Sequence, residues 1–141
     1  MNTSTKVASA GEPVILFRVG PYKFAITASE VHEIREYDAR WIALQKARKE
    51  AGVVTVHLAA ELGLDVGKEQ HILLLRGVDV GLAVGTVEKM AQARKVYQLP
   101  SAFAGKERQW YTGLLVLEGE VVPLVDGIAF AFQSKVAVKG A

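Results

Sequence analysis

Three pairs of short alternating apolar segments, each joined by a turn, constrain the fold of this chain more than any other feature. The pairs are residues 14–19 and 22–27, residues 72–75 and 80–84, and residues 114–117 and 121–125. Alternation with a period of two is typical of half-buried strands, and a short turn between two such runs predicts a β-hairpin. Most residues in these runs are β-branched or aliphatic, which favours strands. The scaffold is therefore predicted to be mainly β.

Helical pattern is limited to short segments. Ser29 is a candidate cap for a single turn, residues 39–51 contain good helix formers, and Asp126 is a candidate cap for a short helix after the last hairpin. The chain also repeats itself faintly, because residues 53–62 and 121–130 each contain a run of valines that leads into a helical pattern. Short strands and hairpins together with a pattern that occurs twice along the chain favour two small barrels rather than one sandwich.

Composition narrows the class of protein. The 141 residues include no cysteine, half of them are hydrophobic, and the net charge is +2, which indicates one packed domain without disulfides or thiolate metal sites. The basic residues are too dispersed for a typical nucleic-acid binder, so no nucleic-acid partner is expected. No apolar run approaches the roughly 18 residues of a membrane span, so we expect a cytoplasmic protein without membrane insertion. The expected boundaries are a disordered tail at 1–13, a domain at 14–133 and a tail at 134–141.

Motifs for catalysis or cofactor binding are weak. The three histidines, His32, His57 and His71, have no spacing typical of a metal site. The glycines at 77, 81 and 85 do not follow the dinucleotide-binding pattern and more readily mark a hairpin turn and close strand contacts. No serine lies in a nucleophile motif. We therefore expect no catalytic residue, no metal site and no cofactor.

An ordered series of segments resembles a known family. The segments are ILFRVGPYKFAI (15–26), VHEIREYD (31–38), GLAVGTVEK (81–89) and GEVVPLVD (119–126). In this order, over about residues 14–132, they resemble the CheW-like domain, the coupling module of bacterial chemotaxis. The resemblance implies two small five-stranded Src-homology-3-like barrels packed together. It also implies a non-catalytic adaptor in the cytoplasm, which links the cytoplasmic tip of methyl-accepting chemoreceptors to the regulatory domain of a CheA-type histidine kinase.

The chain departs from the family pattern at several positions. KARKEAG (46–52) stands where the family has a stretch such as N-L-R-G, and Arg48 is the arginine that this segment offers instead. Thr55, His57 and Gly85 replace a proline and two aspartates of the family pattern. Arg40, Lys46, Arg48 and Lys49 form a basic cluster, so the partner is expected to carry acidic residues opposite them.

Eight residues are candidates for partner binding. Alternation along an extended segment predicts that Val31, Glu33 and Arg35 face a partner while Ile34 enters the core. Trp41, beside the basic segment, is a candidate aromatic anchor. The resemblance adds Arg48 and three residues of the third segment, Leu82, Val84 and Val87. Two alternative functions remain open, namely an interaction module of another two-component or motility pathway and a small-molecule-binding barrel.

Overall fold

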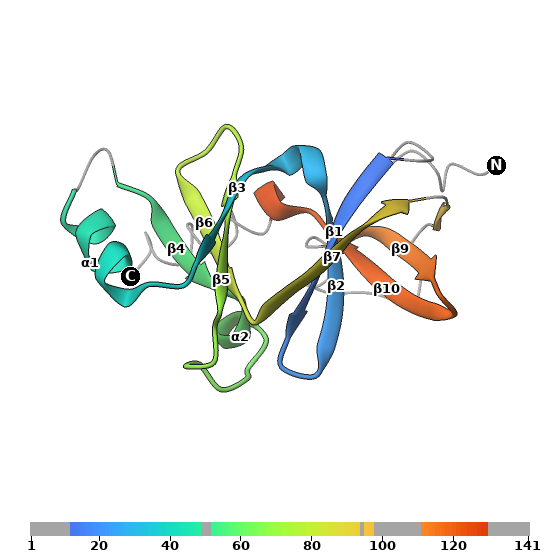
Figure 1. Cartoon of the computed structure of the whole chain (residues 1–141), viewed down its shortest axis with the longest axis horizontal. Coiled ribbons are helices and arrows are strands. Elements are labelled where there is room, and N and C mark those ends of the chain that lie inside the picture. The colour runs from blue at the N-terminus through green and yellow to red at the C-terminus, as the bar shows by residue number, and fades with distance from the viewer. Residues whose placement is uncertain (1–11, 49–51, 94, 98–110, 130–141) are drawn as a thin grey trace.

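The computed structural model describes residues 12–48, 52–93, 95–97 and 111–129, and this part of the chain is mainly β (Figure 1). Its elements are β1 (Glu12–Val19), β2 (Tyr22–Thr27), a 3-10 turn η1 (Ala28–Glu30), β3 (Val31–Glu36), α1 (Ala39–Ala47), β4 (Val54–His57), α2 (Leu58–Glu61), β5 (His71–Leu75), β6 (Val80–Val84), β7 (Thr86–Ala93), β8 (Val96–Tyr97), β9 (Tyr111–Leu117) and β10 (Glu120–Val125). The first strand begins at Glu12, two residues before the expected domain boundary. The expected tails lie outside the described residues, apart from Glu12 and Pro13.

All three predicted hairpins are confirmed. The pairs β1–β2, β5–β6 and β9–β10 are each antiparallel neighbours. In the first hairpin, Val19 pairs with Tyr22, and Gly20 in the turn between them has a φ of 59°. A positive φ favours glycine, so the turn residue and the strand alternation agree on the same register.

The described strands form two sheets. One has the order β7-β1-β2-β10-β9-β8, and the other has the order β3-β5-β6-β4. The repeat noticed in the sequence is confirmed in this topology. Strand β4 runs parallel to β6, the second strand of one hairpin, and β10 runs parallel to β2, the second strand of another. Each of these parallel strands then leads into a short helical segment, α2 or residues 127–129.

Two apolar clusters form the core. The larger one contains residues of both sheets, such as Phe17 and Ile26 from the first sheet with Leu73 and Leu82 from the second, so it lies between the sheets. The smaller cluster contains Val14, Leu16, Ala25, Val96, Leu115, Val122 and Leu124, all from the first sheet. These residues alternate along β1 with members of the larger cluster. The first sheet therefore buries both of its faces.

The expected mainly β architecture with two small β units is confirmed. Within the described residues the strands divide six to four, because β7 follows β6 directly yet pairs with β1 of the other sheet. The chain passes between the sheets at Gly85, whose N–H donates a hydrogen bond to the Arg18 carbonyl at 2.8 Å. A Cβ atom on Gly85 would lie 2.7 Å from that carbonyl oxygen. Only glycine fits here, which confirms the close strand contact predicted at this position.

The helical predictions are confirmed in outline and corrected in detail. Helix α1 ends at Ala47 rather than at residue 51, and its cap is Asp38, whose carboxylate accepts hydrogen bonds from the N–H groups of Arg40 and Trp41. Asp126 caps the last described turn, since its Oδ1 accepts from the Ala129 N–H at 2.9 Å. Ser29 is not a cap. It lies inside η1, and its hydroxyl donates to Glu12 Oε2 instead.

Candidate functional site

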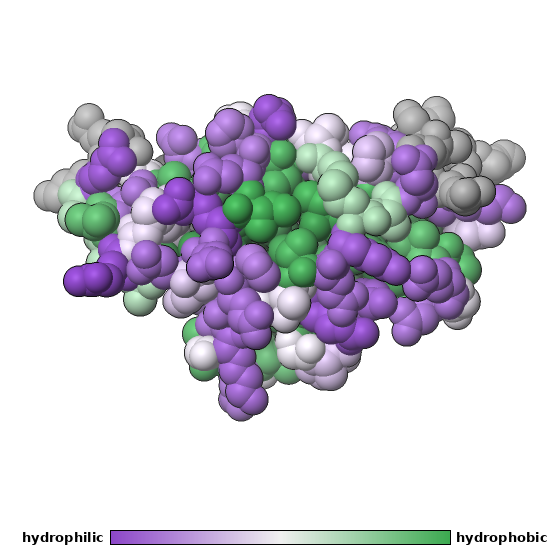
Figure 2. Space-filling view, in the orientation of Figure 1, coloured by the Kyte–Doolittle hydropathy of each residue, from purple (hydrophilic) through white to green (hydrophobic). Residues whose placement is uncertain are grey.

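An apolar surface patch lies between β3 and β7, the edge strands of the two sheets. Ile34 on β3 is 42% exposed and Met90 on β7 is 60% exposed. Ile34 pairs with Leu73, and Met90 pairs with Ile15, and both of these partners belong to the core between the sheets. Figure 2 shows apolar residues gathered at the centre of this face, between β3 and β7 of Figure 1. The patch is therefore the place where the shared core reaches the surface, and we call Ile34 and Met90 the edge pair.

A β-bulge in each edge strand produces this patch. In β3, Val31 pairs with Leu75 and Ile34 with Leu73, so three steps on β3 match two steps on β5. In β7, Val87 pairs with Phe17 and Met90 with Ile15, which is the same three-to-two relationship. Directly paired residues of an antiparallel sheet face the same side. A bulge adds one residue to a strand, so side chains three positions apart, rather than two, face that side. Both strands thus present two apolar side chains three positions apart on one face.

The bulge overturns the predicted orientation of β3. Strict alternation places Val31 toward a partner and Ile34 in the core, but Val31 is 7% exposed and belongs to the core. The extra residue in the bulge turns both side chains toward the same side, and Ile34 is exposed because β3 is an edge strand. Val31 is therefore not a partner-facing residue.

Leu82 and Val84 are likewise corrected, because both are fully buried. They lie on β6, which has β5 and β4 on either side, and α2 packs against it. Every residue of this strand is buried. The side chains of Leu82 and Val84 therefore cannot contact a partner. Val87 is partly buried and packs against the same core from β7.

Three of the other predicted site residues come together beside the patch. Arg35 Nη1 lies 3.5 Å from Glu33 Oε2, and the Arg35 guanidinium lies over the Trp41 ring at 4.6 Å from its centroid. A planar guanidinium stacked on an indole gains cation–π attraction, which holds α1 against β3. Trp41 is partly buried by this contact rather than freely exposed. Arg48 is exposed and lies at the other end of α1, as the residue that follows its last turn.

Sequence reasoning missed Ile34 and Met90 as surface residues. The local signal is a valine followed three positions later by a second large apolar residue, with polar residues between them, as in V-H-E-I and V-E-K-M. This spacing fits a bulged strand, although a helical turn has nearly the same period, so it is ambiguous without the pairing partner.

Charged residues on and beside β7 form ion pairs. Arg18 Nε lies 2.6 Å from Glu88 Oε2, and Lys89 Nζ lies 3.0 Å from Glu118 Oε2. The Arg18 hydrogen bond lowers the pKa of Glu88, and the Lys89 hydrogen bond lowers the pKa of Glu118. Both carboxylates are thus held in their charged form. An apolar centre with a polar border is the usual anatomy of a protein–protein interface.

Two other hollows lie on the described part of the molecule. A cleft of about 620 Å³ is lined by Tyr22, Phe24, Leu62, Tyr111 and Val121 among others, and its cations Arg18 and Lys23 are already paired with Glu88 and Glu120. A smaller hollow of about 190 Å³ lies near Val19, Leu64 and Val84. In the described part of the chain there is no group of three potential metal ligands. No described helix is long and apolar enough to cross a membrane.

His57 and Tyr37 form a contact at a position where the chain departs from the family pattern. The Tyr37 hydroxyl lies 3.1 Å from His57 Nε2, and the two rings meet edge to face. His57 immediately precedes α2, but its side chain makes no capping hydrogen bond. His57 therefore packs against Tyr37 at the end of β4 and does not cap α2.

The chain is similar in sequence to a known protein and similar in fold to a solved structure. No family model matches the chain. The chain is 25% identical over 140 residues to a chemotaxis protein CheW of Rhizobium meliloti strain 1021, with 89% of this chain and 90% of the relative covered. The crystal structure of the scaffolding protein TtCheW from Thermoanaerobacter tengcongensis has a similar fold, with a TM-score of 0.64 and 12% identity over 82% of this chain and 89% of that one. Similarity of sequence over most of the chain and similarity of fold both support the CheW-like domain that the sequence resembles.

Proposed function

We propose that this protein is a non-catalytic scaffold adaptor of bacterial chemotaxis, which couples chemoreceptors to a CheA-type histidine kinase in the cytoplasm. One structural observation supports the proposal most directly, namely the edge pair Ile34 and Met90 at the margin of the shared core. Two large apolar side chains exposed on the edge strands of the two sheets form a surface suited to an apolar helical partner. The similarity to a chemotaxis CheW and to a CheW scaffold supports the biological setting.

In the proposed complex, the apolar patch receives the helical cytoplasmic tip of a methyl-accepting chemoreceptor. Glu33 and Arg35 flank Ile34 along β3, and Glu88 and Lys89 precede Met90 along β7. These four charges supply a polar rim, which favours correct register more than affinity. The regulatory domain of the kinase is the second proposed partner and would use a different surface.

A pair of charge insertions tests the receptor surface. Ile34→Glu and Met90→Glu each bury a carboxylate in the proposed contact, which costs several kcal/mol in an apolar interface. We expect each variant to reduce binding of a receptor-tip fragment at least tenfold in a calorimetric titration. The control is Val116→Glu on β9, where the replaced valine is 50% exposed and lies away from the patch. Melting temperatures within a few degrees of wild type would show that the three variants are folded.

The kinase arm is tested separately by gel filtration with the regulatory domain of a CheA-type kinase. Co-elution with the kinase domain but no receptor binding would favour the alternative of an interaction module in another two-component or motility pathway. Failure to bind either partner would contradict the proposal. A small-molecule-binding barrel is not favoured, because the hollow of about 190 Å³ is smaller than typical ligand pockets of roughly 300–1,000 Å³ and the larger hollows lie on the surface.

A further inference from the structure

Helix α1 presents a row of three side chains that the proposed receptor patch does not use. Arg40, Leu44 and Arg48 are four positions apart, so they follow one another along one side of the helix over about 12 Å. All three are exposed, and Leu44 is 63% exposed, which makes it one of the most exposed large apolar residues in the described chain. We call these residues the α1 row.

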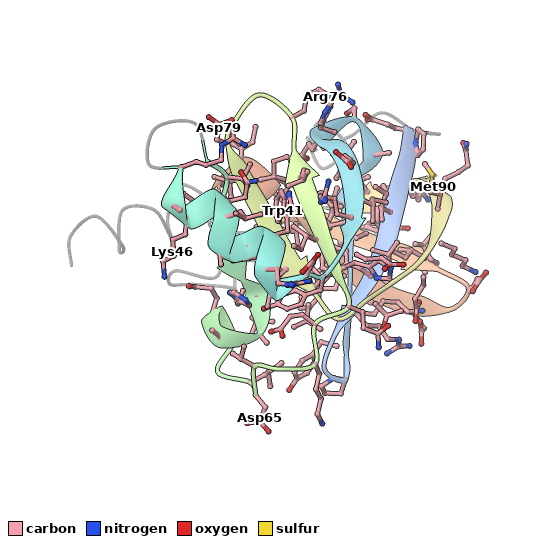
Figure 3. The ribbon with its side chains drawn as sticks, turned by 60° about the vertical axis from the view of Figure 1, so that its left-hand side comes forward. Trp41, Lys46, Asp65, Arg76, Asp79 and Met90 are labelled. Atoms are coloured by element: carbon pink, nitrogen blue, oxygen red, sulfur yellow. The ribbon has the colours of Figure 1, made fainter. Side chains whose placement is uncertain are left out.

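The side of α1 next to this row packs against the protein. Gln45 is buried, and its Oε1 accepts a hydrogen bond from the Val53 N–H at 3.1 Å. Trp41 lies under the Arg35 guanidinium. Figure 3 shows α1 in front, with Lys46 extending from it, while Met90 lies at the other side of the view. The α1 row is therefore held on a fixed helix and lies away from Met90 of the edge pair.

The charged residues of this helix are all basic. The helix and the residue after it contain Arg40, Lys46 and Arg48 and no acidic residue. None of these three cations forms an ion pair within the described residues. Arg40 also lies in the first turn, where the positive end of the helix dipole disfavours a cation. A local arrangement that costs stability and has no ion-pair partner among the described residues points to a use outside the chain.

The shape beside the row can accept an apolar side chain. An open hollow of about 610 Å³ is lined by Asp38, Arg40, Trp41, Ala43 and Leu44. The aromatic and aliphatic walls favour an apolar group, and the arginines at either end of the row favour carboxylates. Arginine binds carboxylates in a bidentate geometry that fixes orientation as well as charge.

We propose that the α1 row is a second docking surface, which binds an acidic α-helical segment of a protein partner that carries an apolar residue with a carboxylate one turn before it and one turn after it. When the segment lies parallel or antiparallel to α1, its apolar residue meets Leu44 and its two carboxylates meet Arg40 and Arg48. An anionic membrane is a poorer fit. The apolar residues 41–44 are consecutive and so extend around the helix, whereas helices that lie in membrane surfaces have one wide apolar face.

The test uses the full chain labelled with nitrogen-15 and two alanine-based helical peptides. One peptide has a single leucine with glutamate one turn before and one turn after it, and the control peptide has lysine at both glutamate positions. We expect the glutamate peptide to shift the amide signals of α1 in NMR spectra, with loss of the shifts in high salt. The lysine peptide should cause no shifts.

Matched variants decide which residues carry the binding. The double variant Arg40→Gln/Arg48→Gln should weaken binding about tenfold, as expected for two exposed ion pairs. Leu44→Ala should weaken it as well, and alanine preserves the helix. Lys68→Gln removes an exposed cation outside α1 and should have no effect.

Two results with the peptides would overturn the proposal, namely equal shifts with both peptides or unchanged binding in the double variant. Vesicles that contain phosphatidylserine, added in place of the peptides, test the membrane alternative. Loss of the α1 signals with these vesicles, without shifts from the glutamate peptide, would also overturn the proposal. Because the receptor-tip and kinase assays above do not involve this peptide, failure here leaves the proposed adaptor function unaffected.

Discussion

The Glu30 carboxylate accepts a hydrogen bond from the backbone N–H of Gly127, with the nitrogen 3.1 Å from Oε1. Glu30 ends η1, the turn that joins the two sheets, and Gly127 follows β10. A Cβ atom on Gly127 would lie 2.8 Å from Ile26 Cδ1, so glycine permits this close approach. The contact ties the connection between the sheets to the last strand of the first sheet.

This contact predicts that stability depends on pH through Glu30. Burial raises the pKa of Glu30 to about 7, and the charge of Asp126 adds to the rise. Because the folded pKa lies above the ordinary value of 4.5, the folded protein holds the proton more tightly than the unfolded chain. The resulting stability is complete below about pH 4.5 and is lost as the pH rises through about 7.

The variant Glu30→Gln tests this prediction, because glutamine keeps a carbonyl acceptor for Gly127 and carries no charge. We expect it to be roughly 1–2 kcal/mol more stable than wild type at about pH 8, a figure reduced for the partial exposure of Glu30, with little difference at about pH 4.5. Urea unfolding at both pH values measures this. Glu36→Gln, at an exposed site on β3, is the control for loss of a charge. Equal effects of the two substitutions at both pH values would contradict the prediction.

The bulge in β3 predicts opposite outcomes for two neighbouring truncations. Val31→Ala removes buried methyl groups and should destabilise the protein by about 2 kcal/mol. Ile34→Ala removes a half-exposed side chain and should cost roughly 0.5 kcal/mol while reducing receptor-tip binding. Chemical denaturation and a binding titration on the same two variants separate the roles. The reverse pattern would show that β3 follows strict alternation.

Strand β3 and its neighbours show which features of the fold the sequence could predict. The hairpins could be predicted because alternation and turn glycines such as Gly20 are local signals that agree. The orientation of Val31 could not, because His32 becomes the extra residue of a bulge only in relation to β5. The parallel pairing of β10 with β2 joins residues about a hundred positions apart, and no local pattern specifies it.

Gly85 accounts for one departure from the family pattern. The family has an aspartate at this position, but here the Arg18 carbonyl occupies the space that a side chain would need. Gly85→Asp should therefore destabilise the protein by about 2–3 kcal/mol or prevent folding, since backbone on both strands would have to move. Gly85→Ala should show a smaller loss in the same direction. Thermal unfolding measures both, and a wild-type melting temperature for Gly85→Asp would exclude the steric explanation.

The Arg18–Glu88 ion pair offers a test of how much the ion pairs on and beside β7 contribute to stability. The side chains are 40% and 28% exposed, so solvent screens their attraction. A double-mutant cycle with Arg18→Met and Glu88→Gln should give a coupling energy of about 0.5 kcal/mol that shrinks in high salt. The lowered pKa of Glu88 means that this contribution is present above its ordinary pKa of 4.5 and is lost as the pH falls below it. A coupling energy that is insensitive to salt would indicate a contact other than an ion pair.

The passage of the chain from one sheet to the other at Gly85 has a consequence for the order of folding. The four-stranded sheet uses only residues 31–84, a continuous stretch, whereas the six-stranded sheet joins β1 and β2 to strands that lie after this stretch. One unit is thus inserted into the other along the chain. During synthesis on the ribosome, all strands of the inserted unit are made before β10. The edge of β2 that pairs with β10 stays unpaired until residues 124 and 125 have been made. The nascent protein therefore exposes an apolar strand edge for most of its synthesis, which makes this edge the point most vulnerable to aggregation.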